Sequence, residues 1–380
     1  MFVFASLWVI FRVFNYCGIF PCYKKCIEGE DHLKPTKTVF LLLKYLIFFG
    51  LFIVSPIAVA LVYNVTWDDL MKGTQGTQIS KIVMGMIFVF FIMEHFISTF
   101  ALWKIKQDLC NLQDFVNSRL ALTLPPEDIV YKIGFFLFLF LSFLSTFLFP
   151  YGLARGLADF LDYNTVGFIA TYALFIIFYI GLLSPVILIV FLLAETLKFV
   201  HRWLRKLQNM VNDPCESKMK VLSEIEKFCN EWKNIQSFVS FPLFESFLFS
   251  IAQVIVVVYV SLSFFINTQT PNNGNMTMQV IGFMTLGTGM TFAFVFTCFY
   301  GEKIGSQVKD LKEIVQDQYI IDLGQSDEAF VMKKLVVCHL CRWENFDGCG
   351  FFTLGKPFLT GLFANFITYI IILIQFQLSE

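Results

Sequence analysis

The residues of this chain that could do chemistry are few, and their spacing does not favour catalysis. The four histidines are His32, His95, His201 and His339. The sequence has no His-Glu-x-x-His, Gly-x-Ser-x-Gly or phosphate-loop motif. The stretch Cys338-His339-Leu340-Cys341, with Cys349 nearby, resembles half of a zinc site, but a structural zinc site needs four well-placed ligands. A helix whose cysteines pack against neighbours is the simpler interpretation, so we expect no enzymatic activity, no cofactor and no bound metal.

The composition predicts a protein that is partly embedded in lipid. Of its 380 residues, 57% are hydrophobic and 18% aromatic, including 49 Phe, and only 15% are charged. A water-soluble domain of this size cannot bury so much apolar surface. The net charge of -1 gives no global basic field, so no nucleic-acid partner is expected.

Seven hydrophobic segments are long enough to cross a bilayer as helices, which takes about 20 residues each. They lie at 39–63, 80–103, 133–152, 166–197, 243–266, 277–300 and 351–377. The fourth segment is longer than one span and carries Pro185, so we expect it to tilt, kink or project beyond the bilayer. The apolar run 1–20 lacks the features of a signal peptide, and we expect a retained interfacial or re-entrant helix there. The predicted fold class is an all-α membrane protein with seven transmembrane helices.

The distribution of basic residues predicts the orientation of these helices. Twenty-three of the 28 Lys and Arg residues fall in the N-terminal segment and the loops after the second, fourth and sixth spans, and only Lys72 and Arg155 fall on the other side. Because basic residues accumulate in cytoplasmic loops, the N-terminus is predicted to be cytoplasmic and the C-terminus extracellular. Two N-glycosylation sequons, at Asn64 and Asn275, fall on the predicted outside. All ten cysteines fall on the predicted inner side or at inner helix ends, where thiols stay reduced.

The inner loops are long and helical in pattern. Between residues 216 and 235, apolar positions recur every three or four residues at Met219, Leu222, Ile225, Phe228, Trp232 and Ile235. The fourth span continues through 198–204, the sixth through 304–314, and a further helical stretch at 328–343 precedes the last span. The simpler interpretation is that these helices cap the membrane bundle. The stronger one is that they extend below the membrane and pack together, within and between subunits.

Two groups of polar residues lie within the spans. Glu94 and His95 are adjacent in the second span, and ionisable groups at membrane depth usually face protein or water. A hydrogen-bonded structural pair is the simpler interpretation, and a role in gating or ligand coupling is the alternative. Outer-half positions of the third to sixth spans could line a small-molecule pocket, or could be helix–helix contacts. Those proposed for the pocket are Tyr151, Tyr172, Gln253, Tyr259, Thr285 and Thr288.

The chain ends with a distinctive stretch, in which Thr368-Tyr369 is followed by five aliphatic residues and then Gln375-Phe376. This stretch resembles the TYhhhhhQF signature of the insect gustatory receptor family. The stretches Gly350–Leu354 and Asn15–Pro21 also resemble segments of that family. The reversed seven-span topology, short outer loops and long helical inner loops fit the family over nearly the whole chain.

The resemblance implies a ligand-gated cation channel of the plasma membrane, assembled as a homo- or hetero-tetramer with related receptors and opened by a small-molecule tastant. It implies a cytoplasmic N-terminal segment (1–38), a ligand-sensing bundle of spans one to six around a pocket open to the outside (39–300), anchor helices between subunits (301–350) and a pore-lining last span (351–380). In that family the last span is split into a cytoplasmic and a membrane part. Gly350, Gly355 and Pro357 are candidates for the break, since they disrupt helices.

Helical spacing gives the last span a polar face. That face carries Asn365, Thr368, Tyr369, Ile372, Gln375, Phe376 and Ser379. Polar groups are unfavourable against lipid, so the face should contact protein or water; around a fourfold axis it becomes a pore wall. We hypothesise that Ile372 and Phe376 form apolar constrictions that gate by dewetting and that Gln375 forms a ring of amides. The uncharged wall predicts loose selectivity, with Glu380 near the outer mouth.

Other functions stay open at this stage. In a transporter, an auxiliary subunit or a structural membrane protein, Gln375 would bond to a neighbouring helix. A G-protein-coupled receptor is disfavoured by the reversed topology and by the lack of the Asp-Arg-Tyr and Asn-Pro-x-x-Tyr motifs. Few acidic residues lie at outer pocket depth, which slightly favours an apolar or aromatic tastant over a sugar. Roles in light, temperature or internal-nutrient sensing also stay open.

Overall fold

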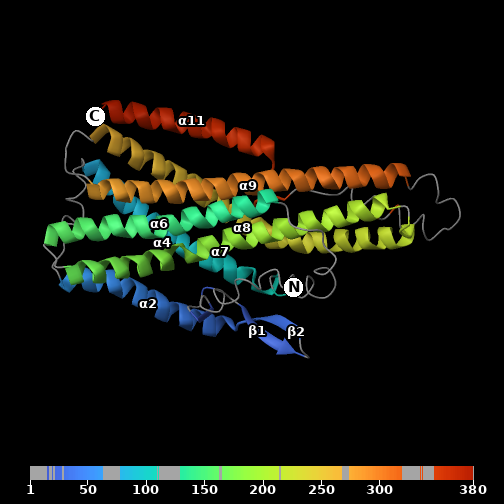
Figure 1. The fold of residues 1–380 in the computed structure, drawn as a ribbon, viewed down its shortest axis with the longest axis horizontal. Helices are drawn as coiled ribbons and strands as arrows, with labels where there is room; N and C mark the ends of the chain where they lie inside the picture. The colour runs from blue at the N-terminus through green and yellow to red at the C-terminus, as the bar shows by residue number, and fades with distance from the viewer. Residues whose placement is uncertain are drawn as a thin grey trace.

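The computed structural model describes residues 15–16, 19, 22–27, 30–62, 78–108, 110, 129–161, 165–213, 215–267, 274–318, 334, 336 and 346–379. Seven long helices make up most of this part of the chain, and they run side by side along one common direction (Figure 1). They are α2 (Thr38–Val62), α4 (Gln78–Lys104), α6 (Ile129–Leu161), α7 (Thr165–Asn212), α8 (Lys218–Asn267), α9 (Gly274–Gln318) and α11 (Lys356–Ser379). Each overlaps one predicted span, so the all-α, seven-helix fold class is confirmed.

The hydrophobicity of these helices fits a membrane protein. Where side chains are described, the helical stretches Thr165–Asn212, Lys218–Val258 and Met284–Gln316 are long and apolar enough to cross a bilayer. Shorter apolar stretches lie at Thr38–Gly50, Phe136–Gly152 and Lys356–Ile372. The exposed surface of α6 carries Phe136, Phe140 and Phe143, which lipid would solvate and water would not.

Helices α7, α8 and α9 are much longer than a membrane span. Helix α7 has 48 residues and α8 has 50, so each is about 70–75 Å long at 1.5 Å per residue. A bilayer core is only about 30 Å thick. The fourth span therefore projects beyond the bilayer, as predicted, and the helix continues through Pro185. In Figure 1 the three long helices extend together beyond the ends of the other helices.

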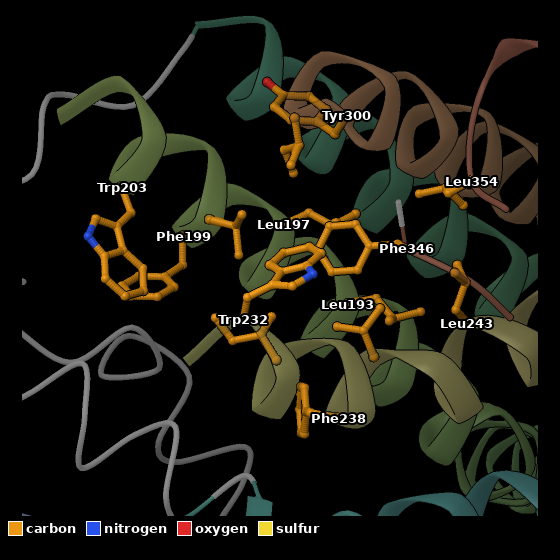
Figure 2. Packing of buried hydrophobic residues seen from close by; sticks show 14 of the residues in the cluster. Leu193, Leu197, Phe199, Trp203, Trp232, Phe238, Leu243, Tyr300, Phe346 and Leu354 are labelled. Atoms are coloured by element: carbon orange, nitrogen blue, oxygen red, sulfur yellow. The ribbon is translucent and has the colours of Figure 1, made fainter. Parts of the chain in front are cut away.

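The projecting ends share a hydrophobic core. Trp203 of α7 is fully buried and meets Phe228 of α8 edge-on, at 4.8 Å between ring centroids. Trp232 packs on Phe346 at 4.5 Å, and Figure 2 shows these two rings against each other. The predicted apolar positions of α8 are buried except Met219, which is 40% exposed. The inner ends of α7 and α8 thus pack together within one chain, as the stronger interpretation predicts. The predicted helix at 328–343 lies largely outside the described residues, and packing below the membrane and between subunits stays a prediction.

The sequence did not predict the β-hairpin that precedes α2. Strands β1 (Cys22–Ile27) and β2 (Glu30–Pro35) pair antiparallel, from Cys22 opposite Pro35 to Ile27 opposite Glu30. Long-range contacts hold the hairpin: the Asn15 side-chain amide donates to the carbonyl of Cys22 at 2.9 Å, and Lys44 of α2 donates to Asn15. The predicted N-terminal interfacial helix falls largely outside the described residues.

The last span begins later than predicted, at Lys356 rather than at residue 351. The residues before it form a tight turn, in which Gly348 N donates to the Phe352 carbonyl and Leu354 N to the Phe346 carbonyl. Gly350 adopts a φ of 76°, a left-handed conformation that glycine accepts at little cost. Pro357 lies in the first turn of α11, where its missing N–H costs nothing. A turn thus lies at the predicted position of the break, while the cytoplasmic part of the split span lies outside the described residues; the start at residue 351 is wrong because this turn occupies residues 346–355.

Candidate functional site

Helix α11 lies at the edge of the bundle, where it packs chiefly against α8 and α9 (Figure 1). Its contact face carries Leu359, Leu362, Phe366 and Ile370, which are buried or half-buried. Their spacing of three or four residues follows one side of a helix. Among the described side chains, most of the other positions of this helix are exposed.

The predicted pore residues lie on this uncovered surface. Asn365, Thr368, Tyr369, Ile372 and Gln375 are all exposed, with Tyr369 at 56% and Ile372 at 40%. The hydroxyl of Thr368 donates to the Ala364 carbonyl of its own helix at 3.1 Å. The side chain of Phe376 lies outside the described part of the structure. A polar stripe thus faces away from the bundle, separate from the contact face.

A third face of α11 is exposed and apolar. It carries Phe363, Ile367 and Ile371. Lipid is a suitable environment for this apolar face, but contact with lipid would be unfavourable for the polar stripe. The two exposed faces therefore call for different surroundings, apolar on one side and protein or water on the other.

An aromatic cluster fixes the start of α11 on the bundle. Phe352 and Phe358 stack in parallel at 4.3 Å, with 7° between their ring planes. Phe247 of α8 packs on both rings, at 4.6 and 4.9 Å. Phe294 of α9 completes the cluster by contact with Phe247 and Phe358. The beginning of the last helix is thereby attached to the two helices that run from the membrane into the inner core.

Glu302 of α9 caps the first turn of α11. The backbone N–H of Lys356 donates to Glu302 Oε2 at 3.1 Å. Gly355 allows the approach, because a Cβ at that position would lie 2.9 Å from the same oxygen. A carboxylate at a helix N-terminus satisfies an otherwise unpaired N–H and interacts favourably with the helix dipole.

Ser240 of α8 holds the preceding turn. Its hydroxyl donates to Asp347 Oδ1 at 2.8 Å and accepts from the Cys349 N–H at 2.9 Å. Helices α8 and α9 thus each supply one polar side chain to the segment that leads into α11.

A family model matches this chain over nearly its whole length. The model of the 7tm chemosensory receptor family matches residues 7–380. The chain belongs to the 7tm chemosensory receptor family. Its fold is similar to the structure of the insect olfactory receptor OR5 from Machilis hrabei, with a TM-score of 0.59 and 14% identity over 98% of this chain and 99% of that one. No curated protein matches the chain significantly.

Two of the predicted pocket residues of this chemosensory receptor are in contact, and the pocket itself stays a prediction. Tyr151 and Tyr172 lie together, edge-to-face at 5.8 Å, and Tyr172 donates to the Phe147 carbonyl at 3.4 Å. Gln253 is fully buried, and neither of its amide atoms has a hydrogen-bond partner among the described residues. The pocket set thus contains one tyrosine pair and one isolated buried amide.

The remaining predicted pocket residues give less support. Thr285 donates to the Gly282 carbonyl of its own helix, and Thr288 is exposed. The side chain of Tyr259 lies outside the described residues. No structural observation connects these three residues to the tyrosine pair.

Glu94 and His95 are both buried, but they face different neighbours. His95 Nδ1 lies 3.2 Å from the Leu182 carbonyl of α7, and its ring stacks on Tyr45 of α2 at 5.7 Å. Glu94 lies within electrostatic reach of Glu245 of α8, and its Oε1 has no hydrogen-bond partner in the described structure. The interpretation of a Glu94–His95 pair is therefore wrong, because consecutive helical residues point about 100° apart.

The sequence analysis did not identify Glu245, the second carboxylate near Glu94. Ser98, one turn after Glu94, donates a hydrogen bond to Glu245 Oε1. Glu245 begins an apolar span in the sequence, and its burial against α4 depends on contacts across 147 residues. The Ser98–Glu245 hydrogen bond therefore joins α4 to the helix that carries Ser240 and Phe247.

Two further predictions concern glycosylation and metal binding. Asn275 lies in the first turn of α9, and Asn64 lies outside the described residues. Glycosylation of both stays a prediction.

Among the described side chains, no group of three His, Cys, Asp or Glu residues could hold a metal ion. Residues 338–341 lie outside that set.

The Glu302 cap predicts a local effect on the start of α11. Glu302→Ala should speed hydrogen exchange of the first-turn amides of α11 roughly fivefold, because a lost cap costs about 1 kcal/mol. Hydrogen-exchange mass spectrometry of peptides covering 354–362 measures this. Glu302→Gln keeps an oxygen acceptor and should give a smaller effect. Equal exchange in Glu302→Ala and the unmodified receptor would show that the cap does not hold the helix.

Proposed function

We propose that this chemosensory receptor is a gustatory-receptor-like, ligand-gated, non-selective cation channel of the plasma membrane. Four copies, of this chain or of related receptors, would surround a pore lined by α11. A small-molecule tastant would bind in the outer half of spans two to six. The proposal assigns 39–300 to sensing, 301–350 to the anchor between subunits and 351–380 to the pore.

The observation that carries the proposal is the exposed polar stripe of α11. Among the described residues, the chain covers the Leu359–Ile370 side of this helix, while Asn365, Thr368 and Gln375 are exposed. In a ring of copies the stripe would face a water-filled axis and the Phe363–Ile371 face would meet lipid or a neighbouring subunit. Both faces then have suitable surroundings, which a single copy in lipid does not provide.

The geometry also supports a route from bundle to pore. Helices α8 and α9 contact the start of α11 through Phe247, Phe294, Ser240 and Glu302. A rearrangement of these helices on ligand binding would move the base of α11 directly. Ile372 and Phe376 would then open or close an apolar constriction beside the ring of Gln375 amides.

Recording from cells that express the receptor tests the proposal. We expect one or more compounds of a tastant panel to evoke a current carried by Na⁺, K⁺ and Ca²⁺ alike, with calcium imaging as the first screen. The current should follow the ion gradients and not the gradient of the tastant. A current that is coupled to uptake of the compound would instead identify a transporter.

A further inference from the structure

Two buried thiols lie against each other at the inner end of α4. Cys22, the first residue of β1, and Cys110, just beyond α4, have their sulfur atoms 3.3 Å apart. They are separated by 88 residues in the chain, and their exposed fractions are 0% and 3%. The six cysteines whose side chains are described are free thiols, so this pair is reduced in the structure.

The surroundings hold both sulfur atoms in place. The thiol of Cys22 lies 3.5 Å from the Lys106 carbonyl, and the side chain of Asn15 bonds to the Cys22 carbonyl. Lys106 in turn donates to Thr38 at the start of α2 at 2.6 Å. Cys22 and Cys110 also belong to one hydrophobic core with Ile19 and Ile105. The hairpin and the end of α4 therefore present the two sulfurs to each other from well-anchored backbones.

We propose that Cys22 and Cys110 are a redox-sensitive pair, which a peroxide converts into a disulfide. A disulfide needs an S–S distance of about 2.05 Å, so the sulfurs must approach by roughly 1.3 Å. One sulfur attacks hydrogen peroxide, the O–O bond breaks, and a sulfenic acid and water result. The second thiol then attacks that sulfur, the S–S bond forms and a second water leaves. Overall, two thiols and one peroxide give one disulfide and two waters.

The short distance between the two sulfur atoms, and not a low thiol pKa, favours this reaction. The hydrogen bond with Cys110, and after it burial, raises the pKa of the Cys22 thiol well above its ordinary value. The thiolate is the reactive form, so Cys22 should resist alkylation at neutral pH. The nearby second sulfur makes closure of the disulfide an intramolecular step, once the first has been oxidised.

The disulfide would tie the hairpin covalently to the helix that carries Glu94 and His95. Relative movement of β1 and α4 would then be restricted in the oxidised receptor. This inference goes beyond the proposed channel function and does not depend on it. The Cys22–Cys110 pair would then be a modification site in the inner N-terminal region, and the fraction of receptor with the disulfide would depend on the peroxide level.

A cleavage assay on the full-length receptor tests the pair. A protease site inserted between Gly73 and Thr74 separates Cys22 from Cys110 when it is cut. After treatment with hydrogen peroxide, alkylation with N-ethylmaleimide in denaturant and cleavage, the two fragments should run as one band without reductant. They should separate after addition of dithiothreitol, and mass spectrometry should find the Cys22 and Cys110 peptides linked.

Single variants assign the bond. Cys22→Ala and Cys110→Ala should each release the fragments after oxidation, while Cys298→Ala, which removes a buried thiol of α9, should leave them joined. If the receptor that keeps both cysteines gives two separate fragments without reductant after peroxide treatment, the proposal is overturned, whether or not the variants fold. A link that persists in both Cys22→Ala and Cys110→Ala would also overturn it, because other cysteines would then form the bond.

Discussion

Replacing Gln375 with glutamate should raise the permeability of the channel to Ca²⁺ relative to Na⁺ severalfold. Gln375 is exposed on the polar stripe of α11, near the outer end of the helix. In a fourfold ring the substitution places four carboxylates around the axis, and rings of acidic side chains concentrate cations in a pore. The effect should be stronger for a divalent ion, because its interaction with each charge is twice as large.

Reversal potentials in solutions of different ions measure this permeability ratio. Thr360→Glu is the matched control, because it adds the same charge to an exposed position of α11 that lies off the stripe. The control should leave the ratio unchanged. If Gln375→Glu gives normal currents with an unchanged ratio, Gln375 does not line the conduction path.

Replacing Trp203 with alanine should lower the free energy of unfolding by about 3–5 kcal/mol. Trp203 is fully buried in the inner core and packs on Phe199 and Phe228, at 5.7 and 4.8 Å between centroids. Truncation leaves a cavity between α7 and α8, where both helices run beyond the membrane. We expect a large fall in the amount of folded receptor and in its melting temperature in detergent.

Two substitutions calibrate this result. Trp203→Phe keeps an aromatic ring and should lose much less stability than the alanine variant. Met219→Ala changes an exposed residue of the same bundle and should alter stability by less than about 0.5 kcal/mol. Equal melting temperatures for Trp203→Ala and Met219→Ala would mean that the inner core contributes little to the fold.

The helices could be predicted because their signals are local. Each span is a long apolar run, and the extension of α8 repeats its apolar residues at helical spacing from Leu222 to Ile235. The hairpin Cys22–Pro35 could not be predicted in this way, because its stability comes from Asn15, Lys44 and the end of α4 rather than from its own alternation. The exposure of Met219 was missed for a related reason, since periodicity predicts which face is buried but not how far along the helix that face is covered.

The candidate site was predicted only in part. The stripe from Asn365 to Gln375 followed from spacing within a single helix. The residues that hold this helix did not, because Glu302 lies 54 residues before Lys356 and Ser240 lies 109 before Cys349. The interaction of Glu94 with Glu245 was missed in the same way, and the adjacent His95 was chosen instead. Ordinary polar residues of this kind carry no local signal of their distant partners.

The accessibility of Gln375 from water tests the central claim most directly, namely that α11 lines a pore. Gln375→Cys and Ile367→Cys place a thiol on the polar stripe and on the exposed apolar face of the same helix. A positively charged, membrane-impermeant methanethiosulfonate, applied from outside during activation, should block the Gln375→Cys current irreversibly and leave the Ile367→Cys current unchanged. Loss of current in Ile367→Cys with no effect on Gln375→Cys would contradict the account, because water would then reach the opposite face of the helix.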